Sequence, residues 1–187
     1  MSIKKIFFCP VVIFAVYFLL FLSCASSKRT PYTNTTETPS KKPIFDVNYK
    51  YESKNPAISI DVTPKWINKY GITEGYDGFA CAFRNNSDKI AKIVWEGSTI
   101  YYDGSSYLPF IEGQKYIDAK SKPMPATILP KDGYLLKMVY SSEQPYFGST
   151  WVMMPIRAKA IQIIFQIDSE SSTEYVTANI SYHFDDE

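Results

Sequence analysis

Apolar residues recur at every second position through most of the chain from Ile44 onward, and this period constrains the fold more than any other feature. A two-residue period places alternate side chains on opposite faces of a β-strand, whereas a surface helix needs a period near 3.6. The pattern is clearest in residues 45–51, 58–62, 79–83, 160–168 and 174–184. Because turn signals separate these short segments, the sequence predicts an all-β fold, an antiparallel β-sandwich of about eight strands over residues 44–187.

Two polar turns predict β-hairpins. The Asn-Asn-Ser-Asp sequence of residues 85–88 separates strands expected at 78–84 and 90–95. A second hairpin is expected around the Asp-Gly-Ser-Ser sequence of residues 103–106. Asn, Asp, Gly and Ser favour such turns because they tolerate unusual backbone angles or bond to their own backbone.

Prolines mark two further features. Thr63 followed by Pro64 offers an N-cap and a first-turn proline, and Gly71 offers a stop, so one short helical turn is expected over residues 64–70. Residues 120–130 contain three prolines. This stretch must be a loop or an edge strand, because proline cannot donate a hydrogen bond to a β ladder.

The first 24 residues form a unit of their own. Lys4 and Lys5 precede an apolar run over residues 6–22, and Ser23 then leads into Cys24. This is the three-part layout of a secretory signal peptide. The run is also nearly long enough to cross a bilayer, so an uncleaved transmembrane anchor is the alternative.

The end of this run, Leu-Phe-Leu-Ser-Cys at residues 20–24, resembles the lipobox of bacterial lipoproteins. That family normally has Leu at the position of Phe21, and the departure resembles the relaxed lipoboxes of spirochaetes. The resemblance implies that a signal peptide of residues 1–23 is removed and that Cys24 is lipidated, with palmitate among the expected acyl chains. Two or three acyl chains anchor a protein stably to a bilayer, whereas one holds it only reversibly. The expected location is therefore the bacterial cell envelope, on the periplasmic side or at the surface.

Residues 24–43 are expected to be a tether between this anchor and the sandwich. Residues 25–43 contain five Thr, three Ser, three Pro and four Lys or Arg, and Tyr32 is the one sizeable apolar group. Such a segment cannot bury enough surface to offset the entropy lost on ordering. As a flexible chain it would span roughly 25 Å.

Of the three cysteines, one would remain as a free thiol in the processed chain. Cys9 would leave with the signal peptide and Cys24 would carry lipid, which leaves Cys81 and no intrachain disulfide. The two-residue period places Cys81 on one strand face with Phe79 and Phe83, so a buried core thiol is expected. The spacing from Cys81 to Trp95 resembles that of immunoglobulin domains, although the second Cys is missing, and it implies an immunoglobulin-like sandwich.

A second resemblance covers about a third of the chain. The segments that carry it are similar to those of an uncharacterised group of bacterial envelope lipoproteins: residues 85–88, 92–95, 113–117, 123–125, 128–130 and Trp151. No activity is established for that group. The resemblance therefore implies a location in the envelope and no chemistry.

Little in the composition suggests catalysis or cofactor binding. The single imidazole, His183, falls on the polar face of the last expected strand, where solvation is the simplest role. The carboxylates considered for a glycosidase pair, Asp61, Glu74, Asp77 and Glu112, are not tied to one another by any motif. No catalytic residue, metal site or cofactor is predicted, and a net charge of +1 argues against nucleic-acid binding.

Aromatic residues carry most of the functional signal, with 15 Tyr, 12 Phe and 3 Trp in the chain. One group between Trp95 and Tyr116 could be core or contact surface. A second group, Tyr146, Phe147 and Trp151, is predicted to lie in a loop as a partner-binding surface, because Tyr and Trp are enriched at interfaces. The sequence thus favours a non-catalytic binding or assembly module whose partner is an envelope protein, a host component or a glycan. A hydrolase acting on cell wall or glycan and a purely structural envelope component are the alternatives.

Overall fold

The alternating pattern folds into antiparallel sheets. The computed structural model describes residues 42–69, 73–170 and 172–185, which lie in one compact unit that begins at Ser40. Cys24 and the expected signal peptide lie outside the described residues, as does the tether apart from Lys42 and Pro43.

Two sheets hold most of the strands. The first sheet has the order β1-β12-β11-β4-β5, with β7 also paired to β4. Its strands are β1 (Ile44–Tyr51), β12 (Thr173–His183), β11 (Ala160–Ser169), β4 (Ala91–Tyr102), β5 (Ser105–Tyr107) and β7 (Thr127–Leu129). The second sheet has the order β2-β3-β8-β6. Its strands are β2 (Ile58–Lys69), β3 (Thr73–Asn85), β8 (Tyr134–Ser141) and β6 (Pro109–Ile111).

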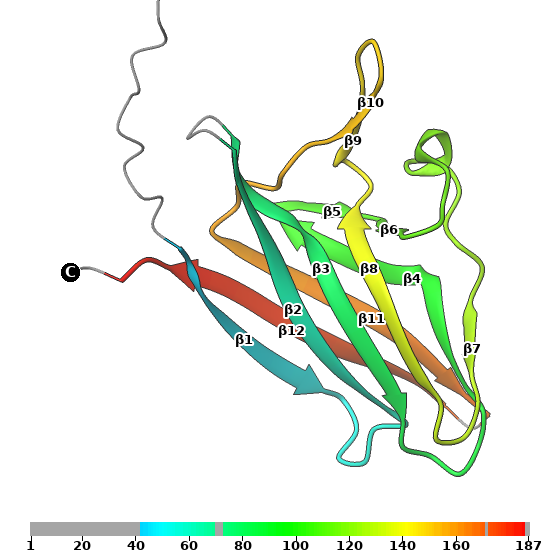
Figure 1. Ribbon diagram of the computed structural model, residues 1–187. Coiled ribbons are helices and arrows are strands. Elements are labelled where there is room, and N and C mark those ends of the chain that lie inside the picture. Colours follow the sequence, from blue (N-terminus) through cyan, green and yellow to red (C-terminus); the bar gives the residue numbers. More distant parts are fainter. Residues whose placement is uncertain (1–41, 70–72, 171, 186–187) are drawn as a thin grey trace, which may run out of the picture. The chain divides into compact units, whose positions relative to one another are not determined.

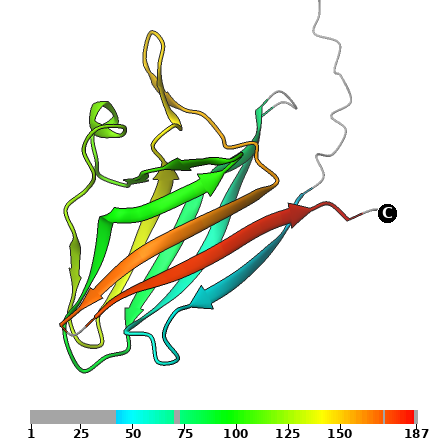
Figure 2. The same cartoon turned by 180° about the vertical axis from the view of Figure 1, so that it is seen from behind.

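Figures 1 and 2 show the two sheets as facing layers, with β2, β3 and β8 in one and β1, β12, β11 and β4 in the other. Two small elements project beyond one end of these layers: the hairpin of β9 (Pro145–Phe147) and β10 (Trp151–Met153), and the loop that contains the 3-10 turn η1 (Tyr116–Asp118). The all-β sandwich predicted from the sequence is therefore confirmed.

The inward-facing residues of both sheets form one core. Phe83 of β3 makes edge-to-face contacts with Trp95 of β4 and Phe165 of β11, with ring centroids 5.8 and 5.2 Å apart. All three side chains are fully buried. Each such aromatic pair adds about 0.5–1.5 kcal/mol beyond the area it buries.

The strand order is that of an immunoglobulin-like domain. In such domains strands A, B, E and D form one sheet and C, F and G the other. Here β2-β3-β8-β6 takes the places of A-B-E-D, while β12-β11-β4 takes those of G-F-C, with β5 beyond C. Cys81 and Trp95 then lie on the B and C strands of opposite sheets, and Cys81 is buried and free. β1 is an additional strand that extends the first sheet beyond β12.

The helical turn predicted over residues 64–70 is wrong. Residues 64–69 continue β2, which is the edge strand of the second sheet. On the open edge of β2, the backbone N–H of Ile60 and that of Val62 donate to the hydroxyls of Tyr51 and Tyr49, at 3.3 and 2.6 Å. Pro64 occupies the next position on this edge, where its missing N–H removes no ladder hydrogen bond. Tyr70 and Gly71 lie outside the described residues.

The hairpin predicted around residues 85–88 is also wrong, because β3 and β4 belong to different sheets. The turn is a crossover between the layers, held by the fully buried Asn85. Its side-chain amide nitrogen donates to the carbonyls of Lys89, Leu129 and Pro130 at 2.8, 3.0 and 3.0 Å. A local turn signal does not specify which sheet the next strand will join.

The second hairpin and the edge strand are confirmed. β4 and β5 are joined at Asp103 and Gly104, which have φ values of 50° and 77°. Two positive φ values are typical of the type I′ turn, whose twist suits a two-residue hairpin. In the proline-rich stretch 120–130, β7 lies at the edge of the first sheet against β4.

Candidate functional site

The aromatic residues predicted as a contact surface lie on the β9–β10 hairpin. Phe147 pairs with Trp151 across the hairpin, and Tyr146 pairs with Val152. Cross-strand partners share a face, and successive residues alternate between faces. The hairpin therefore brings Phe147 and Trp151 together, with ring centroids 5.2 Å apart, and places Tyr146 on the opposite face with Val152.

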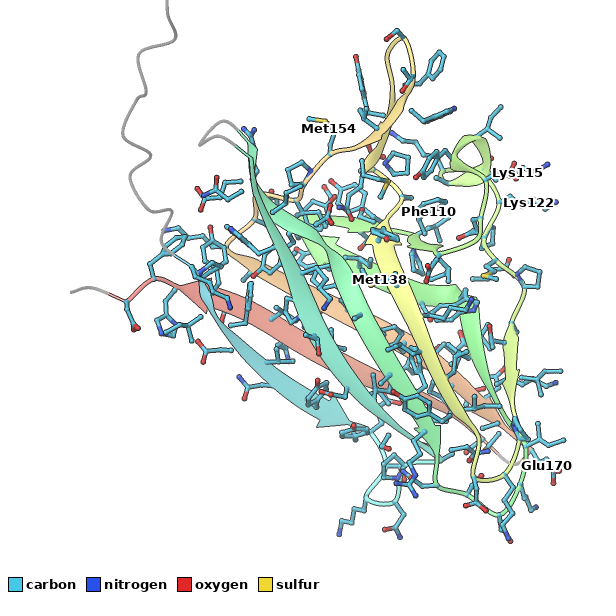
Figure 3. All side chains as sticks on the ribbon, viewed as in Figure 1. Phe110, Lys115, Lys122, Met138, Met154 and Glu170 are labelled. Carbon is cyan, nitrogen blue, oxygen red and sulfur yellow. The ribbon has the colours of Figure 1, made fainter. Side chains whose placement is uncertain are left out.

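A neighbouring loop completes the face that carries Phe147 and Trp151. Tyr116 of η1 lies 5.8 Å from Trp151 and 5.6 Å from Phe110, measured between ring centroids. Phe110 in turn lies 6.0 Å from Tyr140 of β8. The rings thus form a continuous line from the tip of the hairpin to the second sheet. Figure 3 labels Phe110 at the base of this line, between the hairpin and β8.

The rings on the hairpin and on η1 are exposed over a large fraction of their surface. Tyr146 and Phe147 are each 59% exposed, Trp151 is 38% exposed and Tyr116 is 41% exposed. Two exposed aliphatic residues adjoin them, Ile117 and Val152. We call these six residues the hairpin patch: Tyr116, Ile117, Tyr146, Phe147, Trp151 and Val152.

A buried glutamine fixes the base of the hairpin. The Oε1 atom of Gln144 accepts from the backbone N–H of Ser141 at 2.8 Å, and its Nε2 atom donates to the carbonyl of Asp77 at 3.1 Å. The backbone carbonyl of Gln144 accepts from the N–H of Met154 at 2.8 Å. These bonds join β8, β3 and the far end of the hairpin, so the hairpin has a defined position on the sandwich.

The η1 loop is tied down in the same way. Gln114 accepts from the N–H of Ile111 at 2.6 Å and donates to the carbonyl of Lys122 at 3.0 Å. Lys120 forms an ion pair of 2.7 Å with Glu143, next to the hairpin. In Figure 3, Lys115 and Lys122 lie on the side of this loop away from the hairpin. Tyr116 is therefore held beside Trp151 by polar contacts as well as by ring packing.

The group between Trp95 and Tyr116 is divided between core and surface. Trp95 and Phe110 are buried. Tyr102 stacks on Tyr107 with ring centroids 4.5 Å apart, and its hydroxyl lies 3.0 Å from that of Ser141. Tyr101 and Tyr116 are exposed. The sequence prediction missed that Tyr116 joins the second group, and its adjacency to Ile117 in a polar loop was the available signal.

The other residues considered for catalysis, His183 and Cys81, do not belong to the hairpin patch. His183 pairs with Asp46 through atoms 3.2 Å apart, and both side chains are exposed. Burial raises the pKa of the Cys81 thiol well above its ordinary value of 9.0, and the charge of Asp61 adds to this. A thiol in that state is inert at neutral pH. Among residues 42–69, 73–170 and 172–185, no three His, Cys, Asp or Glu side chains gather as a metal site.

Two of the carboxylates considered from the sequence come near the same side chain. Burial raises the pKa of Tyr140, and the charges of Asp77 and Glu112 raise it further. By contrast, Asp61 is exposed on β2, where its carboxylate accepts a hydrogen bond of 3.1 Å from Tyr49. Asp77 and Glu112 are thus two of these carboxylates whose charges act on one side chain, that of Tyr140.

Comparisons with known proteins give no relative. A scan against protein-family models, a search of curated proteins and a search of solved structures each found no match. Within the part of the chain that the structure describes, no helix has the length and apolar character needed to span a membrane.

Proposed function

We propose that this protein is a lipid-anchored lipoprotein of the bacterial envelope, and that its β-sandwich is a non-catalytic binding or assembly module. The hairpin patch is the surface that contacts the partner, a second envelope protein. Support for the anchor comes from the sequence around Cys24, which resembles a lipobox. Support for the binding role comes from the hairpin patch.

The observation that carries the binding role is the set of exposed rings on the hairpin and on η1, which are held on a fixed support. Tyr and Trp provide contact area at a low cost in side-chain entropy, and they are enriched at interfaces. The contacts among Tyr116, Phe147 and Trp151 restrict their rotamers before any partner arrives. A preorganised surface loses less entropy on binding, so more of the contact energy appears as affinity.

A protein fits this surface better than the other partners considered. Apolar side chains lie on both faces of the hairpin, with Tyr146 and Val152 on one and Phe147 and Trp151 on the other. Aliphatic residues, including the 73% exposed Ile117, adjoin the rings. Such a projecting apolar element suits insertion into a groove of another protein, where both faces become buried.

A hydrolase of cell-wall or glycan material is the second candidate, because Asp77 and Glu112 both lie near Tyr140. Glycosidases use a pair of carboxylates that flank the scissile bond. The double variant Asp77→Asn, Glu112→Gln separates the two proposals. A binding module retains its partner after this change, whereas a hydrolase loses turnover of purified peptidoglycan or of a soluble glycan substrate.

The anchor is tested by replacing Cys24. We expect Cys24→Ala to abolish metabolic labelling with palmitate and to move the protein from the membrane to a soluble fraction. Cys9→Ala is the matched control, because it changes a cysteine inside the apolar run and leaves the lipobox intact. Labelling that persists in the Cys24 variant, or membrane retention without any labelling of the wild type, would contradict the lipoprotein proposal.

The binding surface is tested by truncating the paired rings. We expect the double variant Phe147→Ala, Trp151→Ala to reduce recovery of the partner from solubilised envelopes by about tenfold or more, as for a central hot spot. Tyr175→Ala is the matched control, since Tyr175 is 37% exposed and lies on β12, away from the hairpin. Equal losses in both variants, or no loss in either, would count against the hairpin patch.

A further inference from the structure

The outer face of the first sheet carries a row of hydrogen-bonding side chains, one from each of four strands. Asn48 of β1 pairs with Asn179 of β12, Asn179 pairs with Gln162 of β11, and Gln162 pairs with Tyr101 of β4. These residues share one register and therefore project from the same face. Figure 2 shows this sheet as the nearer layer. The row crosses the strands and, at about 4.8 Å per strand, spans roughly 15 Å.

The row lines a groove of about 390 Å³. Ala160 and Ser181 pair with each other in the adjacent register and line the same groove, and their small side chains leave this part hollow. Asp103, in the turn after β4, lines it next to Tyr101. The volume falls within the range of about 300–1,000 Å³ that is typical of small-molecule sites.

The side chains of the row offer both donors and acceptors. The Nε2 atom of Gln162 donates to Oδ1 of Asn179 at 2.9 Å. This leaves Oε1 of Gln162 and the amide nitrogen of Asn179 available, together with the amide of Asn48 and the hydroxyl of Tyr101. An amide group can donate and accept at the same time, which is the property needed to bind a hydroxyl group.

The charge of the groove narrows the ligand class. Among the residues that the structure describes, Asp103 is the one charged residue that lines it, and neither Lys nor Arg does. Phosphate, sulfate and carboxylate groups are bound mainly by Arg and Lys, so an anionic ligand lacks its partners here. The ring of Tyr101 is 43% exposed and offers an electron-rich face to C–H groups.

We infer that this groove, which we call the amide groove, binds a neutral saccharide. The sugar hydroxyls bond to Asn48, Asn179 and Gln162, and the C–H face of one ring packs on Tyr101. This inference does not rest on the proposed function, because the hairpin patch is built from other elements and other residues.

The test measures binding of oligosaccharides to the full chain by calorimetry. The detergent is lauryldimethylamine oxide, which has no sugar headgroup. The neutral probes are the tetrasaccharides of cellulose, amylose, chitin and mannan, and the anionic probes are sialyllactose and a heparin tetrasaccharide. We expect at least one neutral probe to bind with a Kd below about 1 mM and neither anionic probe to bind.

The variants locate the binding to the groove. Asn179→Ala and Tyr101→Ala should each weaken binding by about tenfold, because each removes a group that contacts the sugar. Ala160→Phe keeps every amide and fills the hollow, so it should abolish binding. Thr177→Ala is the matched control. Thr177 lies on the same face of β12 as Asn179, two residues before it, and its replacement should change the Kd less than about twofold. Thermal unfolding of each variant checks that it folds.

Three results would overturn the inference. The first is that none of the neutral probes binds at about 5 mM. The second is that only the anionic probes bind. The third is that a neutral probe binds equally well to the folded Asn179→Ala, Tyr101→Ala and Ala160→Phe variants.

Discussion

The hairpin patch and the amide groove are built by opposite means. The patch lies on two short excursions from the sandwich, β9–β10 and the η1 loop, and a few side-chain hydrogen bonds fix its position. The groove lies on continuous strands, and the register of four strands places its residues. One domain thus offers an apolar projecting surface and a polar recessed one.

The two surfaces should respond differently to substitutions, because different interactions hold their residues in place. The position of the patch depends on buried polar contacts, whose loss leaves unsatisfied donors and acceptors. The groove depends on ladder hydrogen bonds shared by whole strands, so removing one side chain leaves its geometry intact. Substitutions can therefore disturb one surface and spare the other, and the following changes test this in order of decreasing effect.

Trp95→Ala should destabilise both surfaces together. Trp95 is fully buried against Phe83, and its indole N–H donates to Thr127 at 2.8 Å. Truncation leaves a large cavity, so the free energy of unfolding should fall by about 3–5 kcal/mol. Urea denaturation monitored by circular dichroism measures this change. A loss below about 1 kcal/mol would show that the two sheets do not share this core.

Gln144→Ala should disturb the hairpin patch alone. The change leaves the N–H of Ser141 and the carbonyl of Asp77 without their partner, which costs about 1–3 kcal/mol. Hydrogen–deuterium exchange should speed up in residues 141–154 and stay unchanged in β11 and β12. Saccharide binding in the amide groove should also be unchanged. Faster exchange throughout β11 would contradict the independence of the two surfaces.

Alkaline pH should weaken the scaffold that both surfaces share. Burial raises the pKa of Cys81 above its ordinary value of 9.0, so the unfolded chain loses this proton first as pH rises. Above about pH 9 the folded state therefore binds more protons than the unfolded state. The free energy of unfolding then falls by up to about 1.4 kcal/mol per pH unit. Tyrosines are the same in both proteins, so their titration cancels in the comparison. Between pH 8.5 and 10, Cys81→Ala should therefore lose about 1 kcal/mol less than the wild type. Parallel losses in both proteins, measured by urea denaturation, would contradict this cause.

Lys120→Ala should have the smallest effect. The ion pair with Glu143 is 2.7 Å long, but both side chains are largely exposed, at 59% and 44%. Exposed pairs contribute about 0–1 kcal/mol, and salt screens them. We expect the melting temperature to change by about 2 °C or less and partner binding to stay within about twofold. A large loss of binding would show that charge, as well as apolar area, determines recognition by the patch.

Much of the fold could be predicted from the sequence because alternation is a local signal. The buried faces of β2, β3, β11 and β12 follow directly from it. Two predictions were wrong because the local sequence signal is compatible with two different structures. The turn at residues 85–88 serves equally for a hairpin or a crossover, and Pro64 suits an open strand edge as well as a helix start.

The two surfaces differ in how much of each the sequence revealed. Tyr146, Phe147 and Trp151 are close in the chain, and their grouping was visible, although not their division between two faces. The amide groove joins Asn48, Tyr101, Gln162 and Asn179, which are far apart in sequence. Only the long-range register of the first sheet brings them together, so no local pattern could have indicated this site.

Site-specific photocrosslinking in intact cells tests the central claim most directly. A photoreactive benzoyl-phenylalanine is placed at Phe147 or, as control, at Tyr175, which is exposed on β12. The account predicts one discrete protein adduct from position 147, no such adduct from position 175, and loss of the adduct when Trp151→Ala is added. The same adduct from both positions, or none from position 147 in the folded and anchored protein, would contradict it.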